Sequence, residues 1–115
     1  MYRRGDILTL QDGKPALVVE RRRSEFRVAR DNTIIMIEYD PEIVVTGQAY
    51  RLADELSKIA AAMPFGHDVV WRQWLHCELD ERGRLSADSK QRIMDACIGQ
   101  SRTRRVTPFV FMLCS

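Results

Sequence analysis

The amino-acid sequence predicts a single α+β domain over residues 1–115, and two features of its hydrophobic pattern predict it. Up to about residue 40, short apolar runs are separated by turn residues, and residues 24–30 alternate between polar and apolar at a period of two, which is typical of strands. From Gly47 onward the period lengthens to between three and four, as in amphipathic helices. Because strands and helices occupy separate blocks, we expect an α+β fold and not a wound parallel sheet.

Two β-hairpins are predicted in the first block. The first joins residues 7–10 to 16–19 through a turn at 12–15 that contains Gly and Pro. The second joins residues 24–30 to 33–39, which are rich in β-branched side chains. Four short strands on tight connections predict a strongly twisted antiparallel meander, of the kind found in an SH3-like half-barrel.

Two further segments bear on the sheet. Residues 43–45 follow a break at Asp40-Pro41 and fit either one more short strand or an irregular link. Residues 106–114 are almost wholly apolar, and we expect them to form a C-terminal strand that completes the sheet.

About three helices are predicted to pack on the sheet. The most regular apolar stripe spans residues 52–63, with Thr46 as its expected N-cap. A second stripe covers residues 68–79. A third helix is expected to begin after Ser86 and to end at Gly99.

Size and composition indicate an ordinary folded chain. The 115 residues match the size of one domain, and 45% hydrophobic with 30% charged residues is unlike a disordered chain. The sequence has no apolar stretch of transmembrane length and no secretory signal core at its start, so we expect a cytoplasmic protein. Three widely spaced cysteines, Cys77, Cys97 and Cys114, fit a reducing compartment better than a disulfide framework.

The basic residues are biased toward arginine. Only three of the 18 basic residues are Lys, and the formal net charge is +2. Arg forms paired hydrogen bonds with phosphate and carboxylate, so the bias favours a phosphate-bearing or acidic partner. A GC-rich genome would give the same bias whatever the function.

Clustered arginines form the strongest candidate for a binding surface. One cluster lies at the predicted second turn, between the two hairpins, and on the strand after it, and the other precedes the final strand. The candidate residues are Arg21, Arg22, Arg23, Phe26, Arg27 and Arg30, with Arg102, Arg104 and Arg105. Clustered Arg with an interleaved aromatic residue is typical of contact with a nucleic-acid backbone and a stacked base. Because Glu20 and Glu25 flank the first cluster, a solvated or protein-binding surface remains the alternative.

A tryptophan pair gives a second candidate. Trp71 and Trp74 are three positions apart and share one face of the predicted second helix. The pattern favours a role in the core. Exposed rings beside Arg72 would instead be anchors for a protein partner, since Trp and Arg dominate binding hot spots.

Enzyme and metal motifs are missing from the sequence. His67, His76, Cys77 and the distant cysteines match no metal-ligand spacing, and no Gly-rich phosphate loop occurs. His76 and Cys77 are adjacent, so on a helix their side chains point apart and do not form a nucleophile–base pair. We therefore expect no metal, no cofactor, no catalytic residue and no enzymatic activity.

One short resemblance concerns the first hairpin. Arg4-Gly5-Asp6-Ile7-Leu8, followed by Lys14-Pro15-Ala16-Leu17-Val18-Val19, resembles the first two strands of the MazF/Kid family of endoribonuclease toxins, whose members often read RGDI and then RPALVV. The family usually has a longer loop where this chain has residues 9–13. The resemblance implies a small barrel-like start and carries over no catalytic residue.

The sequence thus favours a small non-enzymatic binding module with an Arg-rich surface that engages nucleic acid or an acidic protein. Two alternatives belong to other classes. One is an accessory or inhibitory protein of a phage or mobile element that covers a site on a host protein, and the other is a MazF-like ribonuclease. A homodimer is compatible with each of these, because an isologous pair is the commonest oligomer.

Overall fold

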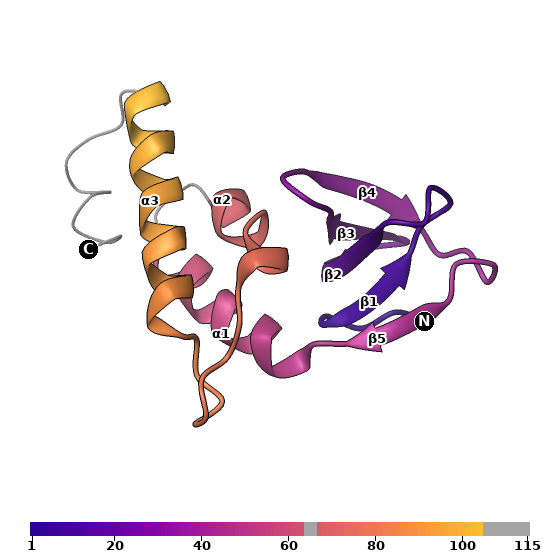
Figure 1. The fold of residues 1–115 in the computed structure, drawn as a ribbon. Coiled ribbons are helices and arrows are strands. Elements are labelled where there is room, and N and C mark those ends of the chain that lie inside the picture. The colour runs from indigo at the N-terminus through magenta and orange to yellow at the C-terminus, as the bar shows by residue number, and fades with distance from the viewer. Residues whose placement is uncertain (64–66, 105–115) are drawn as a thin grey trace.

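A computed structural model describes residues 1–63 and 67–104 of the chain (Figure 1). Strands come first along the chain and helices follow, which confirms the α+β prediction. The elements are β1 (Asp6–Thr9), β2 (Pro15–Arg22), β3 (Glu25–Ala29), β4 (Ile34–Glu38), β5 (Val45–Gln48), α1 (Tyr50–Ala61), α2 (His67–Trp71), a 3-10 helix (Trp74–His76) and α3 (Ala87–Arg104).

The five strands form one antiparallel sheet in the order β4-β3-β2-β1-β5. Both predicted hairpins are confirmed. Of residues 43–45, which fitted either a strand or an irregular link, only Val45 belongs to a strand. It begins β5, which pairs with β1 and places Gly47 opposite Ile7. The predicted strand at 106–114 lies outside the described residues, and the description as an SH3-like half-barrel stays a prediction.

The second predicted helix is interrupted. Helix α2 ends at Trp71, a 3-10 turn holds Trp74, and the chain then runs extended until Leu79 bridges Leu85. The prediction of one helix over 68–79 is therefore wrong. The break lets the Trp74 indole N–H donate to the carbonyl of Ala29 on β3 at 2.8 Å, a bond that satisfies both groups in the core.

Two helix ends differ from the predictions. Thr46 is not an N-cap, because it lies in β5 with its hydroxyl 2.9 Å from that of Thr9. The start of α3 is as predicted, since the Ser86 hydroxyl accepts the Ser89 N–H at 3.2 Å. Its end is not, because α3 continues through Gly99 to Arg104. A glycine inside a helix costs only about 1 kcal/mol, so a long helix tolerates it.

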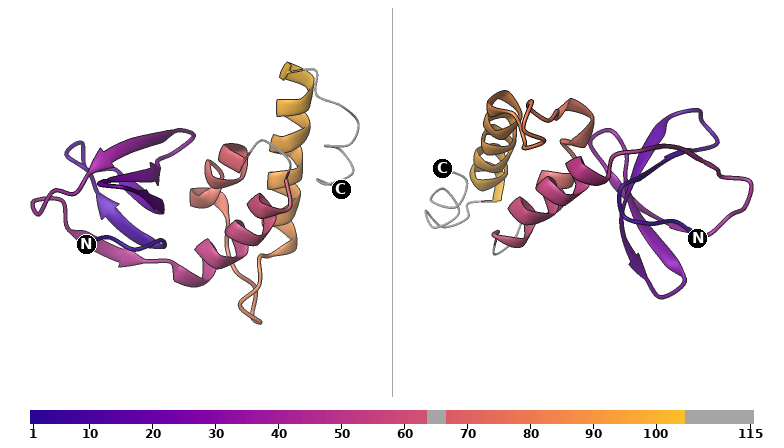
Figure 2. Two further views of the ribbon diagram at one scale, coloured as in Figure 1. Left: turned by 180° about the vertical axis from the view of Figure 1, so that it is seen from behind. Right: turned by 90° about the horizontal axis from the view of Figure 1, so that it is seen from below.

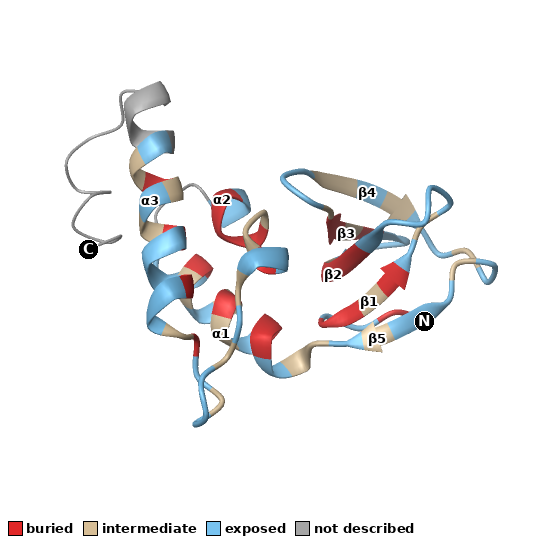
Figure 3. Cartoon of the chain, in the orientation of Figure 1, coloured by how far each residue is buried: buried red, intermediate tan, exposed pale blue. Residues whose placement is uncertain are grey.

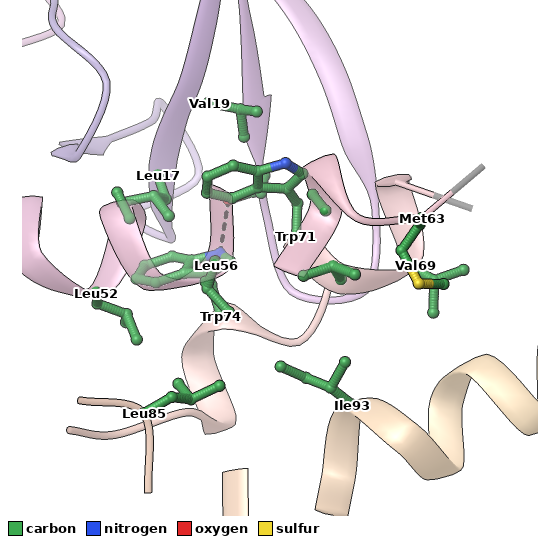
Figure 4. Close-up of a cluster of buried hydrophobic side chains, with 14 of the residues drawn as sticks. Leu17, Val19, Leu52, Leu56, Met63, Val69, Trp71, Trp74, Leu85 and Ile93 are labelled. Carbon is green, nitrogen blue, oxygen red and sulfur yellow. Dashed lines mark hydrogen bonds between the residues drawn. The ribbon is translucent and has the colours of Figure 1, made fainter. Parts of the chain in front are cut away.

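Alternate side chains of β2 serve two cores, because successive side chains point to opposite faces of a strand. The helices cover one face of the sheet, with α1 and α2 between it and α3 (Figures 1 and 2). Leu17 and Val19 belong to this first core, which contains residues of the sheet and of all three helices (Figure 4). The second core lies on the other face and consists of Tyr2, Leu8, Ala16, Val18, Phe26 and Val28. Both faces of β2 are therefore buried in its middle part, from Ala16 to Val19 (Figure 3).

Candidate functional site

Three consecutive arginines stand at the end of the β2–β3 hairpin. Strand β2 runs to Arg22, which pairs with Glu25, so that Arg23 and Ser24 form the turn. Arg23 has a φ of 57°, the left-handed conformation that a two-residue turn requires. Arg21, Arg22 and Arg23 are all exposed. We call these three residues the arginine tip.

The arginine tip presents charge on both faces of the hairpin. Arg21 lies opposite Phe26, and residues opposite each other in an antiparallel pair project to the same face. Arg22 lies opposite Glu25 and projects to the other face, the one that the helices cover further along the sheet. The tip is therefore a positively charged projection and not a flat basic strip.

Arg27, a predicted binding residue, is held by two carboxylates. Its guanidinium donates to Glu20 Oε1 at 2.9 Å and to Asp68 of α2. The Arg27 side chain is 16% exposed. Since Arg27 joins β2, β3 and α2, its charge is compensated within the chain, and the structure gives it a structural role.

Arg30 has a similar position at the next turn. Its guanidinium pairs with Asp12 in the β1–β2 turn, so that the pair joins two neighbouring hairpin ends. Asp12 also accepts the Lys14 backbone N–H at 3.0 Å. That backbone bond, with the Arg30 charge adding to it, lowers the pKa of Asp12. Arg30 is thus compensated as Arg27 is.

Glu20 modifies the charge of the arginine tip. It accepts hydrogen bonds from Arg27 and from Arg22, whose Nε lies 2.8 Å from Oε1. The bond from Arg27 is the main cause that lowers the pKa of Glu20, and Arg22 adds to it. Glu20 is therefore ionised at neutral pH, and its negative charge partly neutralises the positive charge of Arg22.

This lowered pKa predicts a small acid sensitivity. Because the folded state favours the ionised form of Glu20, this residue stabilises the fold at a pH above its pKa in the unfolded chain. The stabilisation is lost as the pH falls through the pKa of Glu20 in the folded state. We expect Glu20→Gln to lower the free energy of unfolding by up to about 1 kcal/mol near neutral pH, with the difference from wild type disappearing in acid. Denaturant unfolding measured across this pH range checks it. Glu81→Gln, at an exposed carboxylate in the turn before Leu85, is the control; an equal effect there would contradict the role of the ion pair.

Phe26 does not belong to the surface. Its side chain is 0% exposed and packs edge-to-face on Tyr2, with ring centroids 5.1 Å apart. The prediction of a base-stacking role is wrong, because the strand alternation that directs Arg27 toward the helices directs Phe26 into the second core.

The second predicted cluster lies on a different element. Arg102 and Arg104 fall within the last turns of α3, whereas the arginine tip belongs to the sheet. Arg105 lies outside the described residues. The candidate surface in the described part of the chain is therefore the hairpin end.

The tryptophan pair lies in the first core. Both rings lie among the buried side chains of this core (Figure 4). Trp71 and Trp74 are each 5% exposed. This burial confirms the core interpretation, and neither ring is presented to a protein partner. Arg72 is half-buried beside them and donates from Nε to the Asp68 carbonyl at 3.3 Å.

Groups suited to metal binding or catalysis are dispersed. Within residues 1–63 and 67–104, no three His, Cys, Asp or Glu side chains gather as a metal site would need. His76 Nε2 lies 3.4 Å from Asp31 Oδ1. Burial raises the pKa of the Cys77 thiol, which disfavours the nucleophilic thiolate. No helix in the described residues is long and apolar enough to cross a membrane.

Glu20 was noted beside the first cluster, but the ion pairs that hold Arg27 and Arg30 were not identified from the sequence. Glu20 was identifiable, since residues 20 and 22 of one strand share a face. Asp68 was not, because it lies 41 residues from Arg27 and meets it only through the packing of α2 on the sheet.

Comparisons with protein-family models, with curated proteins and with solved structures find no match to the chain. A function for the chain therefore rests on the chemistry of its own residues.

Proposed function

We propose that the protein is a non-enzymatic binding module of the cytoplasm whose arginine tip contacts the phosphates of a nucleic acid. The observation that carries the proposal is the exposure of three consecutive arginines at the end of a two-stranded hairpin. A guanidinium is planar and permanently charged, and it donates two parallel hydrogen bonds to a phosphate.

The shape of the hairpin favours a duplex. Arg21 and Arg22 project to opposite faces of a two-stranded ribbon, and the major groove of B-DNA, about 12 Å wide, admits such a ribbon. A hairpin end placed there meets phosphates on both walls of the groove. With Phe26 buried, the tip carries no aromatic side chain to stack on unpaired bases, which again favours a duplex. Because contacts to phosphates carry no sequence information, binding should depend little on base sequence.

The acidic neighbours set the strength of binding. Arg27 and Arg30 are engaged by carboxylates, so we count the three tip residues alone as phosphate contacts. Arg22 has to exchange Glu20 for a phosphate. Weak, strongly salt-dependent binding is the expected result.

The salt dependence of binding tests this assignment. In fluorescence anisotropy with labelled duplex DNA, replacing Arg21, Arg22 and Arg23 together by Ala should weaken binding and reduce the slope of log K against log salt by about 0.9 for each lost contact. The matched control replaces Arg82 and Arg84, exposed arginines of the turn before Leu85, and should leave the slope unchanged. An unaltered slope in the tip variant would exclude the tip as the contact surface.

The alternatives give different results in companion measurements. An acidic protein partner would survive nuclease treatment as one stoichiometric protein in a pull-down, and the tip variant would lose it. A MazF-like ribonuclease would cleave a labelled RNA without added metal. Intact RNA together with salt-dependent binding to the duplex supports the binding module.

A further inference from the structure

Strand β4 leaves one side of its backbone without a partner strand in the described part of the chain. It is an outermost strand of the sheet, paired on one side with β3. At the β3–β4 turn the Arg30 N–H donates to the Thr33 carbonyl at 2.8 Å, so residues 30 and 33 form a hydrogen-bonded pair. In an antiparallel ladder such pairs alternate with pairs whose N–H and C=O groups point away from each other. The groups of Ile34, Met36 and Glu38 therefore point outward.

The side chains of β4 lack the usual protection of an edge strand. Natural edges carry Lys, Pro or a bulge that discourages pairing. Strand β4 reads Ile-Ile-Met-Ile-Glu, and its register with β3 is continuous. The opposite edge differs, since β5 reads Val-Thr-Gly-Gln and its register with β1 is interrupted by a bulge. Pairing is thus favoured at β4.

We propose that β4 pairs with β4 of a second copy of this chain, antiparallel about a two-fold axis at Met36. The outward-pointing residues 34, 36 and 38 are symmetric about Met36, so this register pairs all of them: Met36 with the partner's Met36, and Ile34 with the partner's Glu38 on each side. Shifting the axis to another outward-pointing residue leaves some of these groups unpaired. The dimer is a ten-stranded sheet that is continuous through the two edges.

Side chains and charge agree with this register. Met36 is 44% exposed and becomes covered by its counterpart. Ile35 lies opposite the partner's Ile37, and both already pack at the margin of the second core, so the contact extends that core across the axis. Glu38 faces an isoleucine, so no carboxylate opposes another, and a net charge of +2 per chain adds little repulsion.

The contact is small, so the dimer should be reversible. One pair of five-residue strands buries less than the roughly 1,200 Å² of a standard stable interface. We therefore expect the mass measured by sedimentation to rise from one chain toward two between about 5 and about 500 μM, the range that reveals a weak complex.

Amide hydrogen exchange on the full chain tests the pairing without a mutation. At low concentration the amides of Ile34, Met36 and Glu38 should exchange fast, whereas those of Ile35 and Ile37, bonded to β3, should exchange slowly. At high concentration the exchange of the Ile34, Met36 and Glu38 amides should become slower over the same concentration range in which the measured mass rises. A monomer at all concentrations overturns the proposal. In such a monomer, slow hydrogen exchange at the three outward-pointing amides would show that a segment of the same chain covers β4. Fast exchange would show that the edge is open to solvent.

A matched pair of variants locates the interface. Met36→Lys places a charge at the centre of the proposed contact and should shift the dimerisation midpoint at least about tenfold upward in concentration. Val45→Lys makes the same change on β5 at a side chain of similar exposure, 42%, and should leave the midpoint unchanged. Thermal unfolding followed by circular dichroism shows whether each variant folds. A midpoint that moves with Val45→Lys and not with Met36→Lys would place the dimer contact on β5 and overturn the proposal.

Discussion

Phe26→Ala should lower the free energy of unfolding by about 3–5 kcal/mol, the range for removal of a buried aromatic ring. The second core is small, and Phe26 is among the largest of its fully buried side chains. Its loss removes one of the two ring contacts of Tyr2, which also lies against Tyr39, and opens a cavity between β3 and the N-terminal segment. Urea unfolding followed by tryptophan fluorescence measures the change.

Arg21→Ala is the matched control, since Arg21 lies opposite Phe26 in the register and is exposed. Its effect on stability should stay within about 0.5 kcal/mol. Binding should respond in the opposite order, with Arg21→Ala weakening nucleic-acid affinity and a conservative Phe26→Leu leaving it unchanged. A Phe26→Leu protein that is stable but has lost affinity would return Phe26 to the binding surface.

Gly5→Ala is expected to lower the free energy of unfolding by about 2–5 kcal/mol, through backbone strain of about 1–2 and overpacking of about 1–3. Gly5 has a φ of 97°, and a Cβ there would lie 2.5 Å from Tyr50 Cδ1 and 2.9 Å from Tyr50 Cα. Backbone movement is restricted, because the Gly5 N–H donates to Val18 at 2.9 Å and its carbonyl accepts the Ala49 N–H at 2.7 Å. Thermal or urea unfolding measures the loss.

Gly13→Ala separates the two causes. Gly13 also has a positive φ, 79°, but nothing lies within 4 Å of an added Cβ. Backbone strain alone should therefore lower its stability by about 1–2 kcal/mol. Equal losses at the two positions would show that the contact with Tyr50 adds nothing.

Gly5 also positions a polar cluster where the sheet meets α1. The Tyr50 hydroxyl donates to the buried carboxylate of Asp6 at 2.5 Å, and the Arg3 guanidinium lies 4.9 Å from the Tyr50 ring centroid. The bond to Asp6 raises the pKa of Tyr50, because it favours the neutral phenol. The segment that resembles the MazF/Kid pattern thus has a structural role in this chain, joining the first strand to the first helix.

Part of the candidate site followed from the sequence alone. The turn at Arg23 and the exposure of the arginine tip were predictable, because turn chemistry and strand alternation act over a few residues. The compensation of Arg27 was not. It depends on Asp68, which reaches Arg27 only because α2 packs against the sheet.

The sequence by itself determined the fold class, both hairpins and the start of α3, since each depends on local periodicity or on a capping residue. It favoured burial of the two tryptophans, and the structure confirms that burial. Tertiary structure decided where the predicted helix at 68–79 breaks, because the Trp74 N–H finds its acceptor on β3. It also decided which core receives Phe26 and which strands lie at the two edges of the described sheet. Periodicity shows that a side chain faces an apolar layer; which distant segment supplies that layer is decided by the packing of the whole chain.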